Sequence, residues 1–191
     1  MQSLHYRQVL KLTIYKRLEK LEARIHQEGF TKPTGIGSEI PHFVLDYPAE
    51  EELIVRTYIE GLLKRSPLNI KEINLFEFLL TLFEDDLEEL IELAEEEGYS
   101  ELSQAIQTVL EDRTLLADSF IEQSGDAELI FITGVGTVHP FIRSSHLLKK
   151  LSNHAVRTPL VLFYPGHFSG LDLRLYNQFR HEDEYQITRI S

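Results

Sequence analysis

Three turns in this chain, each following a segment of strand length, carry the residues best placed for binding chemistry. The turns are Asp46-Tyr47-Pro48, Thr133-Gly134-Val135-Gly136 and Tyr164-Pro165-Gly166. Open α/β sheets bind ligands outside the carboxyl ends of their strands, so the three turns could converge on one cleft. The alternative is that proline and glycine merely reverse the chain. The candidates for a cleft or partner surface are Asp46, Tyr47, Glu52, Arg56, Gly134, Gly136, Arg143, Tyr164 and Gly166.

The turn at 133–136 would suit an anion, because it precedes an expected helix whose first backbone amides are free. It lacks the lysine and hydroxyl residue of a phosphate-binding P-loop. Nor does it complete the G-x-G-x-x-G pattern of dinucleotide sites, because His139 and Pro140 follow the two glycines. A bare Gly-Val-Gly is a weak signal, and a divergent nucleotide-binding regulatory domain is kept only as an alternative.

Two arginines could serve such a cleft. Arg143 falls in the first turn of an expected helix over 141–154, where a cation opposes the helix dipole and needs a partner. That partner is either Asp46 or an external anion, and we favour the internal pair. Arg56 follows Glu52 by four residues, in the favourable order for an intrahelical ion pair. It either forms that solvated pair or reaches the cleft.

The remaining residue types indicate no catalytic or metal-binding set. The chain has no cysteine, which excludes disulfides, thiolate metal sites and a cysteine nucleophile. Its eight histidines include no H-E-x-x-H or H-x-H pattern, and Ser144 and Ser145 lie outside any G-x-S-x-G turn. We therefore expect no metal, no cofactor and no enzymatic activity.

Length and composition favour one soluble domain spanning 1–191. Of the 191 residues, 42% are hydrophobic and 26% are charged, which is ordinary for a globular protein with a core. The sequence contains no run of 18 apolar residues and no signal-peptide pattern. We expect no membrane association and a cytoplasmic protein.

The charge is strongly negative and unevenly distributed. A formal net charge of −12 makes the chain a poor generic DNA binder, so contact through the basic first helix would be weak and salt-dependent. Residues 84–97 hold nine acids and no base. That run is either a solvated helix face or a surface for a basic partner.

Hydrophobic periodicity predicts the elements that position these residues. A leading helix within 1–30 carries an apolar stripe, which packs on the same domain or docks a partner. A strand over 42–46, a helix over 50–64 and a strand over 69–75 then form a βαβ unit with parallel strands. A helical insertion is expected over 76–123. The stripe of the leading helix is Leu10, Ile14, Leu18, Leu21 and Ile25, and the apolar face of the second helix is Leu53, Ile54, Tyr58, Leu62 and Leu63.

The last third returns to strands and a helix. The apolar runs at 127–133 and 160–166 are expected to be buried strands around the helix over 141–154. LDLRLY and EYQITRI form two closing strands or a terminal hairpin. The expected fold is therefore α/β, with a mainly parallel central sheet flanked by helices. It is Rossmann-like or P-loop-like without a Walker A motif.

Several blocks of this sequence resemble one known family. FVLDYPAEEELIVR, INLFEFL, ELIFITGVGTVHPFIRSSHLLKKL and LVLFYPG followed by LDLRLY resemble, in collinear order over about 40–190, the BrxB family of bacterial BREX phage-defence systems. The resemblance implies a non-enzymatic adaptor or scaffold that binds other BREX proteins and supports DNA methylation and phage exclusion. PglZ is the expected direct partner, with PglX and BrxC as further candidates. The family commonly has an acid after the glycine of FYPG, where this chain has His167.

Overall fold

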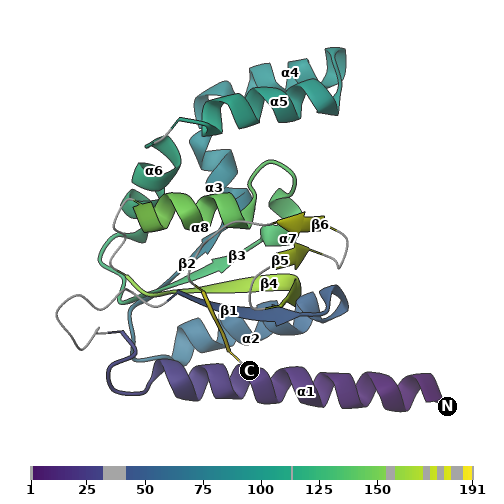
Figure 1. The fold of residues 1–191 in the computed structure, drawn as a ribbon, viewed down its shortest axis with the longest axis vertical. Helices are drawn as coiled ribbons and strands as arrows, with labels where there is room; N and C mark the ends of the chain where they lie inside the picture. Colours follow the sequence, from purple (N-terminus) through teal and green to yellow (C-terminus); the bar gives the residue numbers. More distant parts are fainter. Residues whose placement is uncertain are drawn as a thin grey trace.

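A central sheet of five parallel strands organises the computed structural model, in the order β2-β3-β4-β1-β7 (Figure 1). The structure describes residues 2–31, 42–112, 114–153, 158–169, 173–175, 179–181 and 187–190. The strands of the parallel sheet are β1 (His42–Tyr47), β2 (Ile70–Asn74), β3 (Leu129–Thr133), β4 (Leu160–Phe168) and β7 (Thr188–Arg189). The α/β prediction is confirmed, including the parallel sheet.

The central strands are buried along their length because helices cover both faces of the sheet. Every residue of β1 and β3 is buried, as are the first six of β4. Val44 of β1 lies opposite Leu162 of β4, which in turn lies opposite Ile132 of β3. Their side chains alternate between two cores, with Val44 in one and its neighbours Phe43 and Leu45 in the other.

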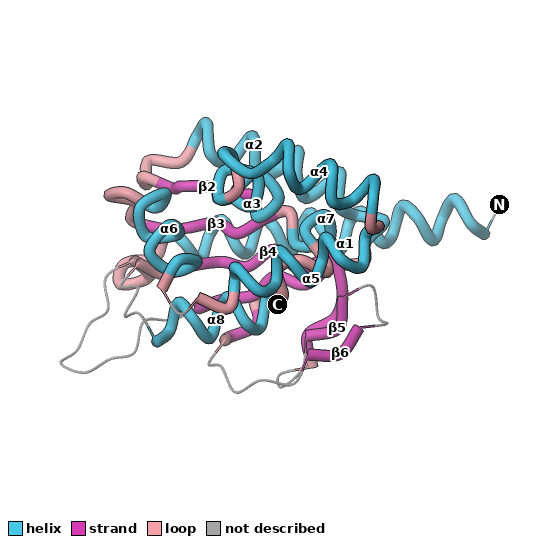
Figure 2. Tube along the Cα trace, turned by 90° about the horizontal axis from the view of Figure 1, so that it is seen from above, coloured by secondary structure: helices cyan, strands magenta, loops and turns pink. Residues whose placement is uncertain are grey.

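Helices form a layer on each side of the sheet (Figures 1 and 2). The first layer contains α1 (Gln2–Ile25) and α2 (Glu52–Arg65), which contact each other. The second layer contains α3 (Leu75–Leu82), α6 (Leu115–Ser124), α7 (Val135–Val138) and α8 (Ser144–Asn153). The predicted crossover from β1 through α2 to β2 is present, and it carries the chain from the interior of the sheet to its far edge.

The stripe of α1 packs inside the molecule. Ile14, Leu18, Leu21 and Ile25 are all buried in the same core as α2, which confirms the internal packing of this part of the stripe. The side chain of Leu10 lies outside the described part of the chain.

The predicted apolar face of α2 is correct in part, because Leu62 is buried and Ile54, Tyr58 and Leu63 pack partly buried against the core. The helix buries Val55, Ile59 and Leu62, spaced at i, i+4 and i+7, whereas Leu53 is 74% exposed. Because α2 has apolar residues on much of its circumference, the pattern alone does not say which side meets the sheet. The burial of Val55 and Ile59 turns Leu53 outward.

The segment between β2 and β3 is helical, and part of it projects from the body (Figure 1). After α3 come the 3-10 turn η2 (Glu84–Asp86), α4 (Leu87–Glu96) and α5 (Tyr99–Leu110). α4 buries none of its residues, whereas α5 buries Ile106 and Leu110. The acidic run at 84–97 is therefore largely a solvated face.

The end of the sheet differs from the sequence prediction. β4 does not stop at Pro165-Gly166 but continues to Phe168, and Gly166 pairs antiparallel with Leu175 of β5 (Leu173–Leu175). β5 pairs in turn with β6 (Phe179–His181), so LDLRLY and EYQITRI form two separate strands, the first of the two alternatives, and not one terminal hairpin. EYQITRI supplies β7, which runs parallel to β1. A two-residue strand leaves almost no periodic signal in a sequence.

One buried lysine fastens the insertion to the body of the protein. Lys150 of α8 is 9% exposed, and its Nζ donates to the carbonyl oxygen of Leu110, the last residue of α5, at 2.7 Å. It also donates to the carbonyl of Asp112. These carbonyls have no continuing helix to satisfy them, so a cation there completes the C-terminus of α5.

We predict that Lys150→Met lowers the free energy of unfolding by about 1.5–3 kcal/mol, because two carbonyls lose a charged donor. Urea denaturation measures the change. Lys149→Met is the matched control, since Lys149 is exposed on the same helix and its loss should change stability little. Equal effects of both substitutions would contradict the fastening role.

Candidate functional site

The carboxyl ends of the central strands gather at one edge of the sheet. β3, β4 and β1 are adjacent and parallel, and Tyr47 at the end of β1 lies opposite Pro165 of β4. Thr133 at the end of β3 lies opposite Asn74 at the end of β2. The edge that α/β proteins use for ligands is thus built from the predicted turns.

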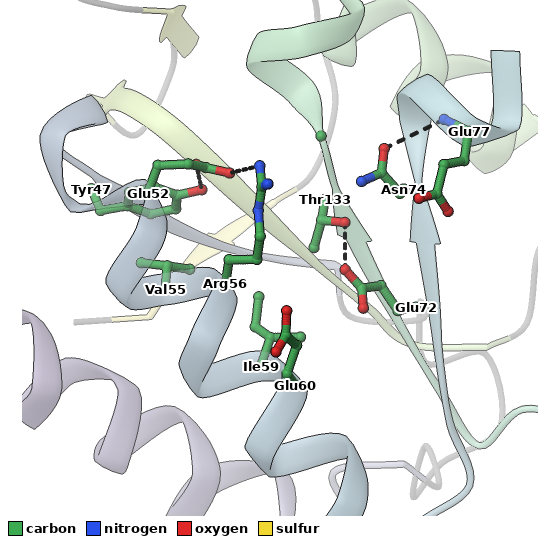
Figure 3. A pocket seen from close by; sticks show the side chains of 11 residues that line it. Tyr47, Glu52, Val55, Arg56, Ile59, Glu60, Glu72, Asn74, Glu77 and Thr133 are labelled. Carbon is green, nitrogen blue, oxygen red and sulfur yellow. Dashed lines mark hydrogen bonds and ion pairs between the residues drawn. The ribbon is translucent and has the colours of Figure 1, made fainter. Parts of the chain in front are cut away.

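A pocket of about 250 Å³ opens at this edge, between α2 and the ends of β2 and β3 (Figure 3). It brings together four of the residues that the sequence singled out: Tyr47, Glu52, Arg56 and Gly134. The sequence reasoning did not single out the others. They are Val55, Ile59, Glu60, Glu72, Asn74, Glu77 and Thr133.

One end of the pocket is held by a short chain of hydrogen bonds. The Tyr47 hydroxyl donates to Glu52 Oε2 at 2.6 Å, and Arg56 Nη2 donates to Glu52 Oε1 at 3.2 Å. The intrahelical pair of Glu52 and Arg56 is therefore formed, and Arg56 also lines the pocket. The two alternatives for Arg56, the pair with Glu52 and a position at the pocket, therefore do not exclude each other.

The opposite wall is fixed by Thr133 and Asn74. Thr133 Oγ1 donates to Glu72 Oε1 at 2.7 Å, which links β3 to β2. Asn74 Oδ1 accepts from the amides of Phe76 at 3.0 Å and Glu77 at 3.4 Å. Asn74 is thus the N-cap of α3, and this bond holds its side chain at the rim of the pocket.

A glycine at position 134 leaves room for the Asn74 side chain that caps α3. Its φ is 72°, in the left-handed region, and a Cβ there would lie 2.4 Å from Asn74 Oδ1. The glycine of the turn therefore permits close packing of two strand ends. The helix that follows, α7, has four residues, so the turn does not open a long helix whose amides could hold an anion. Gly136 lies within α7, outside the pocket.

The charges around the pocket disfavour a phosphate. Four glutamates line it against a single arginine, and Arg56 is already paired with Glu52. A nucleotide would meet repulsion from the other carboxylates. Among the described residues, no group of three or more histidine, aspartate or glutamate side chains is arranged to hold a metal ion.

Asp46 is buried beside this edge, and the predicted pair with Arg143 is wrong. Asp46 is 2% exposed, and Arg189 of β7 binds it through two bonds of 2.8 Å. Arg17 of α1 donates to it at 3.0 Å, and the Phe168 amide does so at 3.1 Å.

Arg143 is not the partner of Asp46, because Arg17 and Arg189 already pair with that carboxylate. α8 starts at Ser144, so Arg143 immediately precedes it, and its carbonyl oxygen accepts from Leu147 N at 3.0 Å. Its side chain is exposed. An exposed guanidinium is solvated by water, so its position at the positive end of the helix dipole demands no internal partner.

The two remaining candidates lie outside the pocket. Tyr164 is 1% exposed in the middle of β4, and Gly166 pairs with β5. His167, next to Gly166, places its Nδ1 3.5 Å from Asp46 Oδ2. A role of these residues in partner binding stays a prediction.

The pKa of Asp46 reflects two opposing effects. Burial raises it, but the hydrogen bonds from Arg189 and the Phe168 amide, with the charges of Arg189 and Arg17, outweigh burial. The pKa therefore lies below the unfolded value of 3.8. Asp46 is a structural anion whose charge is stabilised by its partners.

The chain matches the family model described as "BREX protein BrxB" over residues 71–190. It belongs to the BrxB family. A BREX protein BrxB of Bacillus cereus (strain H3081.97) is 30% identical over 186 residues, covering 93% of this chain and 97% of the relative. One of Escherichia coli O9:H4 (strain HS) is 28% identical over 181 residues, covering 91% and 90%. No solved structure matches the chain.

BrxB membership makes the chain a component of a BREX phage-defence system. The similarity extends to the first strand and first helix, since the curated relatives match almost the whole chain. Across the described residues, no helix is both long and apolar enough to cross a membrane.

We predict that Asp46→Asn lowers the free energy of unfolding at pH 7 by about 3 kcal/mol, because it removes the anion from a buried ion pair. Since folding lowers the pKa of Asp46, its contribution is complete above pH 3.8 and is lost as the pH falls through the folded value. Denaturant titrations at several pH values should show the gap between wild type and variant closing in acid. Asp85→Asn, an exposed aspartate, is the control; a gap that widened in acid would refute this assignment.

A second prediction concerns Gly134. Gly134→Ala should destabilise the fold by about 1–3 kcal/mol, because the new Cβ meets the Asn74 side chain in a left-handed backbone conformation. Thermal unfolding measures the loss. In an Asn74→Ala background the same substitution should cost less, since the colliding oxygen is gone. Additive costs would show that the contact with Asn74 plays no part.

Proposed function

We propose that this BrxB-family chain is a non-enzymatic adaptor or scaffold in the BREX system, which binds other BREX proteins and so supports DNA methylation and phage exclusion. PglZ is the partner we expect first, and PglX and BrxC follow. The proposal includes a cytoplasmic location. The observation that carries it is a set of large apolar side chains left exposed on the helices.

The most exposed of those side chains among the described residues lie on α2, α4 and the start of α5. Leu53 is 74% exposed, Ile91 is 57% exposed and Tyr99 is 81% exposed. Single exposed apolar residues are ordinary, but tyrosine and large aliphatic side chains on projecting helices suit a protein interface. The hairpin of α4 and α5 stands away from the sheet, where a partner can reach both helices (Figure 1).

The alternative, a nucleotide-binding regulatory domain, has less support. It rests on a pocket at the carboxyl edge of a parallel sheet, where such ligands bind in other α/β proteins. Four glutamates line the pocket, and the side chain of Asn74 occupies the space beside Gly134. Both features disfavour the binding of a phosphate there. Direct DNA binding has the same difficulty, because the net charge is −12.

We predict that the purified full chain forms a stable complex with purified PglZ of the same BREX system, measured by biolayer interferometry and size-exclusion chromatography. PglX and BrxC are tested alongside, with and without DNA. Calorimetry with ATP, GTP and dinucleotides should show no heat of binding. Failure to bind any of the three proteins, or micromolar nucleotide affinity, would overturn the proposal.

A further inference from the structure

We propose that the apolar side of α4 binds an amphipathic helix of a partner protein, one whose apolar stripe is flanked by lysine or arginine. This inference rests on the proposed adaptor function and assigns its binding surface. It draws on the apolar residues that α4 leaves accessible, on the place of α4 in the fold and on the charge around those residues.

α4 carries an apolar stripe that the described part of the chain covers only in part. Its members have the spacing i, i+3, i+4 and i+7, which places them on one side of the helix. Leu87, Leu90 and Ala94 are half-buried, and Ile91 is 57% exposed. The neighbouring α5, by contrast, buries Ile106 of its own stripe. Helices in proteins owe most of their stability to the packing of such a stripe, so α4 has a side on which a partner can pack.

The place of α4 in the fold leaves this side open to another protein. The hairpin of α4 and α5 projects from the body, and Tyr99 at the start of α5 is 81% exposed (Figure 1). The long helices α1 and α2 lie in the layer on the opposite side of the sheet, so neither packs on α4 (Figures 1 and 2). Tyrosine is enriched in protein interfaces, which suits a contact that extends over the tip of the hairpin.

The charge around the stripe selects among the possible occupants. From Glu84 to Leu110 the chain has ten acids and no lysine, arginine or histidine. Two copies of the chain that met through this hairpin would place acid against acid, and the phosphates of DNA or of a lipid surface would be repelled. A helix with lysine or arginine beside its apolar stripe has the complementary charge, and it packs its stripe on that of α4.

The first test removes apolar contact from α4 without altering its charge. We expect Ile91→Ser to weaken binding about tenfold to whichever BREX protein binds the wild-type chain, because the partner helix loses a large apolar contact. Biolayer interferometry measures the change. The matched control is Ile121→Ser on α6, which removes an exposed isoleucine outside the hairpin and should bind within about twofold of wild type.

The second test removes charge and keeps side-chain shape. Glu88→Gln/Glu92→Gln neutralises two exposed acids of α4 and should slow association about threefold or more at low salt, because the attraction of a basic helix is weakened. The difference from wild type should shrink as the salt concentration rises, since salt screens exposed charges. Glu19→Gln/Glu28→Gln changes the net charge equally at exposed positions far from α4 in the sequence, and it should slow association less.

The outcomes separate this inference from the adaptor function. If wild type binds a BREX protein and Ile91→Ser binds it equally well, the assignment to α4 is wrong and the adaptor function stands. Equal association rates for Glu88→Gln/Glu92→Gln and wild type would refute a basic occupant. If light scattering shows a dimer of the wild-type chain that Ile91→Ser dissociates, a second copy covers α4 and the proposed occupant is wrong. If wild type binds no BREX protein, the adaptor function fails and this inference fails with it.

A crosslinking measurement identifies the occupant without depending on how the variants fold. A photo-crosslinking amino acid replaces Tyr99 in an otherwise unchanged chain, and mass spectrometry identifies the linked partner peptide. We expect a peptide with apolar residues at helical spacing and with lysine or arginine beside them. A linked peptide without basic residues, or a crosslink to nucleic acid, would overturn the assignment.

Discussion

The buried charge of Asp46 is the constraint on which the edge of the sheet depends. A carboxylate that is 2% exposed must be paired, because an isolated buried charge costs several kcal/mol. Its partners come from α1, from the last strand β7 and from the end of β4. Since β7 has only two residues, the two bonds from Arg189 to Asp46 add to its short ladder in holding this strand against β1.

This pairing divides the carboxyl edge of the sheet into two parts with different properties. Around β1, β4 and β7, the cations of Arg17 and Arg189 are used internally on Asp46. Between α2 and the ends of β2 and β3, acids are left without cations and a pocket stays open. The edge is therefore not one continuous cleft. Its closed part stabilises the fold, and its open part is lined by four glutamates and one arginine.

Features that depend on residues close together in the sequence could be predicted, and features that depend on contacts between distant residues could not. β1, β3 and β4 are continuous apolar runs, and α1 carries a clear stripe, so local patterns sufficed for them. The partners of Asp46 lie 29 and 143 positions away, and no spacing rule connects them. Arg143 was misassigned because its side chain is exposed and Asp46 is paired with Arg17 and Arg189 instead. Glu60 and Glu77 line one pocket because α2 and the start of α3 meet at the ends of β2 and β3, and no local pattern connects the two helices.

The distribution of charge also bears on how such a component works beside DNA. A chain with a net charge of −12 repels phosphate, so the role in DNA methylation that we propose is better served by contacts with proteins that hold the DNA. Proteins that bind DNA carry basic surfaces, and the acidic α4 together with the pocket glutamates would steer such surfaces toward this chain. Steering affects the rate of encounter and the choice of partner more than the strength of the complex. The strength must then come from desolvated apolar contact, and among the described residues Leu53, Ile91 and Tyr99 are the most exposed large apolar side chains.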